Sequence, residues 1–161
     1  MDARAAHLIA ALGLTPHPEG GYYREIYRSQ DVVQPTDGRG DRASLTTIYF
    51  LLVAGQVSRW HRVAADEAWH YYEGAALELL TADEHFDQVA RREVGSVMED
   101  ARPVHVVPAN MWQAACSTGA YTLMGCTVAP GFEFADFQML DADPKLAESV
   151  KRGRPDLARF I

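Results

Sequence analysis

Short apolar runs separated by turn residues fill most of the chain. From Leu45 onward, runs rich in β-branched and aromatic residues follow one another at close spacing, among them LTTIYFLL, VSRWHRV, AWHYYEG and YTLMGCTV. Gly, Pro, Asn and Asp residues separate these runs, a pattern typical of an antiparallel sandwich or barrel. The run YYREIYR at residues 22–28 predicts one more strand before them, and FEFADFQ at residues 132–138 predicts a last one.

Helical spacing appears only near the two ends of the chain. Residues 3–12 place apolar side chains on one helical face, with Asp2 placed to cap the start and Gly13 to end the helix. The tail from Asp143 is also predicted to be helical, because it has a capping acid, a proline in the first turn and a later glycine that ends the helix. We therefore expect one all-β domain over residues 1–161, with a short helix at each end.

A polar, glycine-containing segment between residues 30 and 44 is the longest predicted connection. Connections of this length lie on the surface and often cover binding sites. We expect it to act as a mobile flap that sets the size of a pocket.

The stretch RWHRVAADEAWHYYEG, residues 59–74, contains most of the candidate catalytic and binding residues. Side chains alternate along a strand, so Arg59 and His61 share one face, and Glu67, Trp69 and Tyr71 share a face of the next strand. If the two strands form a hairpin around AAD, His61 and Glu67 face the same interior. His70 then points to the opposite face, unless a bulge turns it inward.

The spacing of Gly55, His61, Val63, Glu67 and Gly74 resembles the first cupin motif. Val63 stands where a metal-binding cupin has its second histidine. VPANMWQAACS resembles the second cupin motif, with Asn110 in place of the turn glycine and Gln113 in place of the histidine. Asparagine still suits a turn that needs positive φ.

The wider chain, from about residue 5 to 140, resembles the fifth cupin subfamily. HPEGGYYREIYRS, TTIYFLL, VPANMWQAA and APGFEFADFQML carry this resemblance, in order, together with the first motif. It implies the jelly-roll barrel (double-stranded β-helix) of the dTDP-sugar 3,5-epimerases, in which the position of His61 carries a general base and no metal is needed. The subfamily and the epimerases are similar in forming dimers, so the resemblance also implies a homodimer.

Three functions follow from this resemblance and the residues. The first is a metal-independent isomerase or epimerase acting on a sugar-like or anionic metabolite, with His61 as base and Glu67 orienting it. The second is a non-catalytic pocket for a small molecule, and the third is a metal-dependent enzyme. For substrate binding we expect the side chains of Arg59, Trp69, Tyr71, Gln113, Arg24 and Tyr49. The candidates for a proton donor are Tyr23, Tyr49, Tyr71 and Tyr121.

A bound cofactor is not expected, because Val63 cannot bind a metal and Gln113 is a weak neutral donor for a transition metal. Any divalent metal would have to use His61, Glu67, Gln113 and, after a bulge, His70.

The composition argues against nucleic acids and membranes as partners. The net charge is -7 and the basic residues are scattered, which disfavours nucleic acids and membrane surfaces. No apolar run approaches the roughly 18 residues that span a bilayer, and the N-terminus lacks a signal-peptide pattern. Two cysteines placed too far apart to bridge favour a reduced, cytoplasmic protein.

Trp60 and Trp112 fall on the outer faces of their predicted strands. Large aromatic side chains are seldom exposed on monomers, so we expect a second sheet or a dimer partner to cover them.

Overall fold

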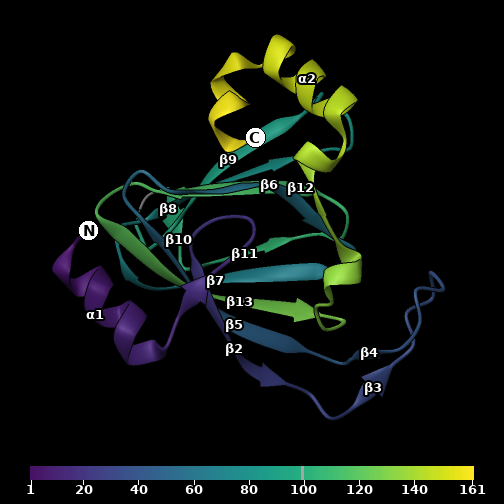
Figure 1. Cartoon of the computed structure of the whole chain (residues 1–161), viewed down its shortest axis with the longest axis horizontal. Helices are drawn as coiled ribbons and strands as arrows, with labels where there is room; N and C mark the ends of the chain where they lie inside the picture. Colours follow the sequence, from purple (N-terminus) through teal and green to yellow (C-terminus); the bar gives the residue numbers. More distant parts are fainter. Residues whose placement is uncertain (99) are drawn as a thin grey trace.

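Two six-stranded sheets face each other in the computed structural model, which describes residues 1–98 and 100–161 (Figure 1). The first sheet has the order β1-β2-β5-β13-β7-β11. Its strands are β1 (Thr15–Pro16), β2 (Tyr22–Arg28), β5 (Thr46–Val53), β13 (Tyr121–Ala129), β7 (Asp66–Gly74) and β11 (Val104–Val107).

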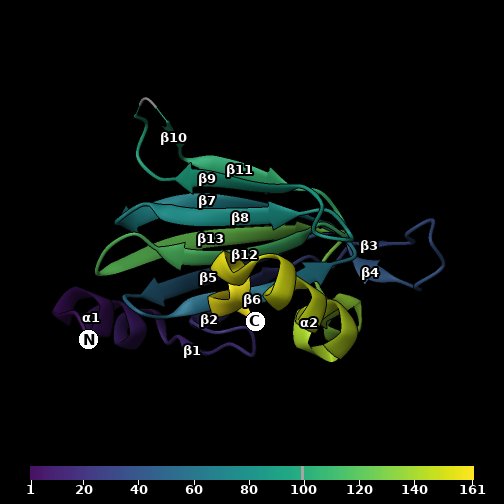
Figure 2. The ribbon, with the colours of Figure 1, turned by 90° about the horizontal axis from the view of Figure 1, so that it is seen from above.

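The second sheet has the order β10-β9-β8-β12-β6-β14. Its strands are β10 (Ala101–Arg102), β9 (Val89–Val94), β8 (Leu77–Ala82), β12 (Trp112–Ser117), β6 (Val57–Val63) and β14 (Phe137–Met139). The two layers make the predicted jelly-roll barrel, and Figure 2 shows one sheet in front of the other, with their strands running along a common direction.

Strands β6 and β7 do not form the expected hairpin. β6 pairs with β12 and β14, whereas β7 pairs with β13 and β11 in the other sheet. The short connection between them passes from one sheet to the other, as successive strands of a jelly roll do. Inward side chains of β6 and β7 therefore face each other across the barrel.

The last predicted strand is mostly wrong. Within FEFADFQ, residues Phe134–Asp136 form a 3-10 turn (η1), and only the residues from Phe137 onward pair as β14. The pattern also gave no sign of β9, whose charged run VARREV has an exposed middle. Alternation of apolar residues cannot mark a strand that has little apolar surface to bury.

Both terminal helices lie where the sequence predicts them. Helix α1 (Ala3–Leu12) begins at Asp2, whose carboxylate accepts two backbone N–H groups, and ends at Gly13 with φ 62°. Helix α2 (Pro144–Gly153) begins at Asp143, whose carboxylate accepts the N–H of Leu146. Two 3-10 turns flank α2, η2 (Leu140–Ala142) and η3 (Pro155–Phe160).

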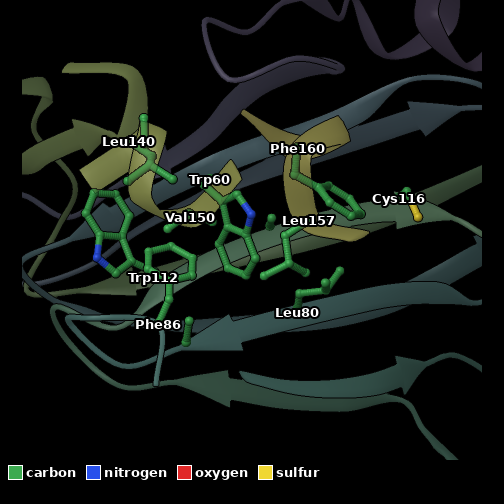
Figure 3. Packing of buried hydrophobic residues seen from close by; sticks show 12 residues of the cluster. Trp60, Leu80, Phe86, Trp112, Cys116, Leu140, Val150, Leu157 and Phe160 are labelled. Atoms are coloured by element: carbon green, nitrogen blue, oxygen red, sulfur yellow. The ribbon is translucent and has the colours of Figure 1, made fainter. Parts of the chain in front are cut away.

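The C-terminal helical segment covers the outer face of the second sheet (Figures 1 and 3). Trp60 and Trp112 are fully buried there against Leu157 and Phe160 of η3 and Phe86 of a loop. The expected cover for the two tryptophans, a second sheet or a dimer partner, is thus wrong. The chain supplies the cover itself.

Inside the barrel, apolar side chains fill one half. Phe50, Leu52 and Met124 of the first sheet pack against Leu77 and Leu79 of the second. The other half is open enough to hold a cavity.

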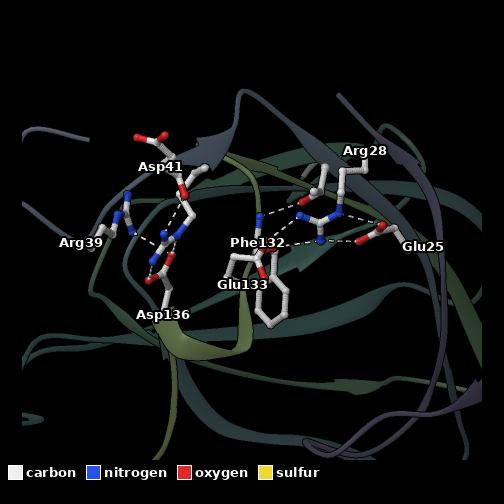
Figure 4. Close-up of polar contacts among 9 residues, drawn as sticks. Glu25, Arg28, Arg39, Asp41, Phe132, Glu133 and Asp136 are labelled. Atoms are coloured by element: carbon white, nitrogen blue, oxygen red, sulfur yellow. Dashed lines mark hydrogen bonds and ion pairs between the residues drawn. The ribbon is translucent and has the colours of Figure 1, made fainter. Parts of the chain in front are cut away.

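The segment between residues 30 and 44 forms a small hairpin, β3 (Val32–Val33) with β4 (Arg42–Ala43), that projects from the barrel (Figure 1). Arg42 holds Asp136 of η1 through two hydrogen bonds of 2.7 Å, and Arg39 lies 3.5 Å from the same carboxylate (Figure 4). Arg39 also donates to the carbonyl of Ala64. The segment is therefore tied to the turn beside the cavity.

Cys116 and Cys126 are both free and buried. In the described part of the chain, no helix has the length and apolar character needed to cross a membrane.

Candidate functional site

A cavity of about 290 Å³ lies between the two sheets, in the half of the barrel that the apolar core leaves open. It is lined by both sheets and by the segments before β2 and after β13. The lining residues are His17, Glu19, Tyr23, Glu25, Arg28, Thr46, Ile48, Phe50, His61, Val63, Glu67, Trp69, Cys126, Val128, Phe132, Glu133, Phe134 and Phe137.

His61 and Glu67 both line this cavity, from opposite sheets. His61 is 2% exposed and Glu67 is 7% exposed, so both ionisable groups are removed from bulk water. Their placement in one ligand-sized hollow is as the sequence predicts, although they reach it from facing walls and not along one hairpin.

Glu19 is a third buried ionisable group, and sequence reasoning did not place it in the site. It is 5% exposed, and one of its oxygens lies 3.3 Å from Nε2 of His61. The other oxygen accepts a hydrogen bond of 2.7 Å from the hydroxyl of Ser58. Glu19, not Glu67, is therefore the carboxylate in contact with the His61 ring.

The glycine after Glu19 makes this contact possible. The segment runs close along β6, where the N–H of Arg59 donates to the carbonyl of Glu19. Gly20 has φ +113°, and a methyl group there would overlap the carbonyl oxygen of Val57. Only glycine gives the backbone this conformation and this closeness. The two glycines of HPEGG are the sequence feature from which this close approach of the backbone could have been predicted.

The protonation of His61 follows from its two partners. Its Nδ1 lies 2.8 Å from the carbonyl of Arg59, which can only accept, so Nδ1 carries a proton. Its Nε2 then faces the Glu19 carboxyl at 3.3 Å, a contact that is favourable only when one of the two groups carries a proton. Burial lowers the pKa of His61 and raises the pKa of Glu19. These shifts favour the neutral ring and the protonated carboxyl, so the proton of the pair belongs mainly to Glu19, and the same Glu19 oxygen also lies 3.4 Å from Nδ1 of His17.

His17 sits next to this pair. Its Nδ1 accepts a hydrogen bond from the backbone N–H of Glu19, so its proton is on Nε2 when the ring is neutral. Burial lowers its pKa, which favours the neutral ring. The ring packs edge-on against Tyr23, with centroids 4.5 Å apart.

Glu67 is oriented by a chain of hydrogen bonds behind the cavity wall. The amide of Gln113 donates to Glu67 at 2.6 Å, and the Gln113 carbonyl accepts from the indole of Trp69 at 2.9 Å. Burial is the main cause that raises the pKa of Glu67, to about 7. A carboxyl group with this pKa can give or take a proton near neutral pH.

A metal does not fit the donor atoms present. Val63 offers none, and both ends of the Gln113 amide are used by Glu67 and Trp69. Nδ1 of His61 is bonded to a backbone carbonyl, which leaves Nε2 as the one free ring nitrogen, and that atom faces the Glu19 carboxyl at 3.3 Å. Across residues 1–98 and 100–161, no three His, Cys, Asp or Glu side chains are grouped so that they could hold a metal ion. His70 does not line the cavity.

Arg59 is outside the cavity, contrary to expectation. His61 pairs with Gln113 and Ser58 pairs with Ala115, so β6 has one residue more than β12 over this step. This bulge keeps Ser58 and His61 facing inward and turns Arg59 outward. Its guanidinium is bound to Asp141 and to the carbonyl of Pro18.

Three further residues expected to bind substrate also lie elsewhere. Arg24 bonds the carbonyl of Leu12 at the end of α1, and Tyr49 packs with the α1 cluster on the outer face of its sheet. Tyr71 points inward but packs against the apolar half of the barrel and donates to the carbonyl of Gly74. Among the four tyrosines considered as proton donors, only Tyr23 lines the cavity.

Arg28 takes the place at the cavity that was expected for Arg24. The register of β2 against β5 shifts between Glu25 and Tyr27, which adds one residue to β2. The shift brings Arg28 to the cavity together with Glu25, two positions that strict alternation puts on opposite faces.

Comparison with known proteins agrees with this architecture. The model of one protein family, described as "Cupin superfamily (DUF985)", matches residues 6–140. A hypothetical protein from Leishmania major is 30% identical, with a TM-score of 0.83 over 97% of this chain and 96% of that one. A protein from Shewanella oneidensis is 29% identical, with a TM-score of 0.84 over the same shares.

A more distant structure shares the fold alone. Oxalate decarboxylase from Bacillus subtilis is 15% identical, with a TM-score of 0.57 over 86% of this chain and 33% of that one. A search of curated proteins found no match.

Proposed function

Because the chain belongs to this cupin family, DUF985, we propose that its barrel binds a small polar molecule and moves protons on it, as a metal-independent isomerase or epimerase. One observation carries the proposal. Three ionisable side chains, Glu19, His61 and Glu67, are each less than 10% exposed and share one cavity. Burying such groups is costly for folding, and clusters of them are typical of acid–base sites.

Epimerisation needs two groups on opposite sides of a carbon atom. One removes a proton from a carbon next to a carbonyl, and the other returns a proton to the opposite face. Glu67 on β7 and His61 on β6 belong to facing sheets. In one direction Glu67 accepts the carbon-bound proton and the His61–Glu19 pair gives up its proton. In the reverse direction His61 is the base.

The protons balance over this cycle. Each turnover leaves Glu67 protonated and the His61–Glu19 pair one proton short. The reverse reaction, or exchange with water, restores the starting state.

Solvent-deuterium exchange tests the proposal. The protein is incubated in D₂O with a panel of pentoses, hexoses and amino sugars, and binding and loss of C–H signals are followed by proton NMR. We expect at least one bound compound to lose a C–H signal with the wild type and to keep it with His61→Ala or Glu67→Gln. Compounds that bind but keep every C–H signal would instead identify a binding protein without turnover.

A further inference from the structure

The cavity has an excess of acidic side chains. Among the described residues that line it, the carboxylates are Glu19, Glu25, Glu67 and Glu133, and the only arginine or lysine is Arg28. The two lining histidines, His17 and His61, have lowered pKa values because they are buried. Burial also raises the pKa of Glu19 and raises that of Glu67 to about 7, which favours their neutral forms. Glu25 and Glu133 alone still outnumber Arg28, so the lining offers more negative than positive charge.

Arg28 has little capacity left for a ligand. Glu25 holds it through two hydrogen bonds, of 3.1 and 2.8 Å, and Glu133 accepts a third at 2.7 Å (Figure 4). The carbonyl of Phe132 accepts a fourth at 3.1 Å. An anionic ligand would have to displace these partners while facing the remaining carboxylates. This arrangement argues against an anionic metabolite as the ligand, which was one expectation from the sequence.

Aromatic rings also line the cavity. Phe132, Phe134 and Phe137 meet with centroids 5.1 to 6.1 Å apart and planes at 67 to 83° to one another. Tyr23 and Trp69 line the same space from the first sheet. Ring faces attract a positive charge that has been removed from water, and several rings with a carboxylate make a suitable site for an ammonium group.

We infer that the cavity selects a small organic cation, a molecule that carries an ammonium group, over neutral or anionic molecules of the same shape. Ionised Glu67 and the excess charge of Glu25 and Glu133 over Arg28 supply the charge complement, the rings supply the contact surface, and Arg28 is kept from competing by Glu25 and Glu133. This inference rests on the cavity that the proposed function uses and adds the charge of its ligand.

A shape-matched series tests the inference. Choline, 3,3-dimethylbutan-1-ol and 3,3-dimethylbutanoate have similar branched frames and carry a positive, no and a negative charge. Their binding to the full-length protein is measured by calorimetry or NMR titration. We expect choline to bind at least about tenfold more tightly than the alcohol, and the carboxylate to bind least. Equal or tighter binding of the alcohol or the carboxylate, or no binding of choline at millimolar concentration, overturns the inference.

Variants show whether the cavity carboxylates cause the preference. Glu67→Gln keeps the shape of the side chain and should weaken choline binding by about tenfold, with little effect on the alcohol. Glu148→Gln, on an exposed position of α2, is the matched control and should change neither. An unchanged choline affinity in Glu67→Gln contradicts the inference, provided that the variant shows the wild-type circular dichroism spectrum.

The two proposals can fail separately. If the charge order holds but no bound compound exchanges a C–H proton, the ligand class stands and the isomerase function falls. If exchange occurs on a neutral or anionic compound and choline does not bind, the reverse is true.

Discussion

The Glu67 carboxyl couples protonation to folding. Its pKa is about 7 in the folded protein, against an ordinary value of 4.5. Between these two pH values the folded protein keeps a proton that the unfolded chain has released, so stability falls as pH rises. Below about pH 4.5 both states are protonated, and above about pH 7 both are ionised and the loss is complete.

Glu67→Gln removes this titration. We expect its free energy of unfolding, relative to the wild type, to rise by about 3 kcal/mol between about pH 4 and about pH 8. Urea unfolding at the two pH values measures this difference. Glu148→Gln serves as control and should show a constant difference. A Glu67→Gln difference that is equally independent of pH would mean that Glu67 titrates normally.

Releasing Arg28 should change the charge preference of the cavity. In the double variant Glu25→Gln and Glu133→Gln, the guanidinium loses both charged partners and can bind a carboxylate. We expect binding of 3,3-dimethylbutanoate to strengthen by about tenfold, and choline binding to weaken. Titration of both compounds checks this. Unchanged affinities for both would show that Arg28 and its partners do not face the bound ligand.

At this scale the sequence predicted three residues of the cavity wall but missed Glu19, which contacts His61. His61, Glu67 and Trp69 follow from alternation and motif spacing, and the positive φ of Asn110, 66°, follows from its place in the second motif. Arg59 was misplaced and Arg28 was missed because each lies next to a bulge. A bulge adds one residue without a reliable sequence sign, and every side chain beyond it changes face.

Among the connecting elements, the PEGG turn fixes the distance between Glu19 and His61. Gly20→Ala places a methyl group against the Val57 carbonyl at a φ that side chains rarely adopt. We expect it to lower the free energy of unfolding by about 3 kcal/mol. Gly38→Ala is a matched control, since Gly38 also has positive φ, +80°, but no atom within 4 Å. That change should cost only about 1 kcal/mol. Equal costs, measured by urea unfolding, would argue against a close approach at Gly20.

The β3–β4 hairpin is held to the cavity turn by Arg42 and Asp136. Arg42→Met breaks both hydrogen bonds and leaves the buried carboxylate of Asp136 with Arg39 alone. We expect limited proteolysis between residues 30 and 44 to become several-fold faster. Lys145→Met, on exposed α2, controls for loss of a charge elsewhere. If the cleavage rate stays the same, the hairpin is held by other contacts.

Strands with an apolar face were predictable, and their pairing was not. The ranges of β2 and β6 match the predicted runs residue for residue. Their partners depend on the order of strands in two sheets, which period-two patterns do not encode. The short link after Val63 was therefore read as a hairpin turn, although it joins opposite sheets.

For the molecule as a whole, the C-terminal segment acts as a lid on the second sheet's outer face. Leu157 and Phe160 are fully buried against the two tryptophans. Leu157→Ala should lower the free energy of unfolding by about 2–5 kcal/mol, because the cavity left behind cannot fully close. Tryptophan fluorescence during urea unfolding measures this loss. Ala158→Gly, at a less buried position of the same turn, should cost less, and a similar cost for both would argue against the packing role.

A homodimer remains a prediction from the family resemblance. Trp60 and Trp112, for which a dimer partner was one expected cover, are buried within the chain itself. Sedimentation velocity tests it directly: we expect a single species near twice 17.8 kDa. A species at the monomer mass would contradict the prediction.

The ionic tether between Arg42 and Asp136 has a consequence for how such a protein could diversify. Asp136 lies in the same short turn as Phe134, and Phe137 follows directly, so the outlying hairpin helps to hold two of the rings that line the cavity. Insertions or substitutions in that hairpin could shift the rings and alter which molecules enter. The buried acid–base cluster would remain untouched, so changes in selectivity need not risk the chemistry or the stability of the barrel.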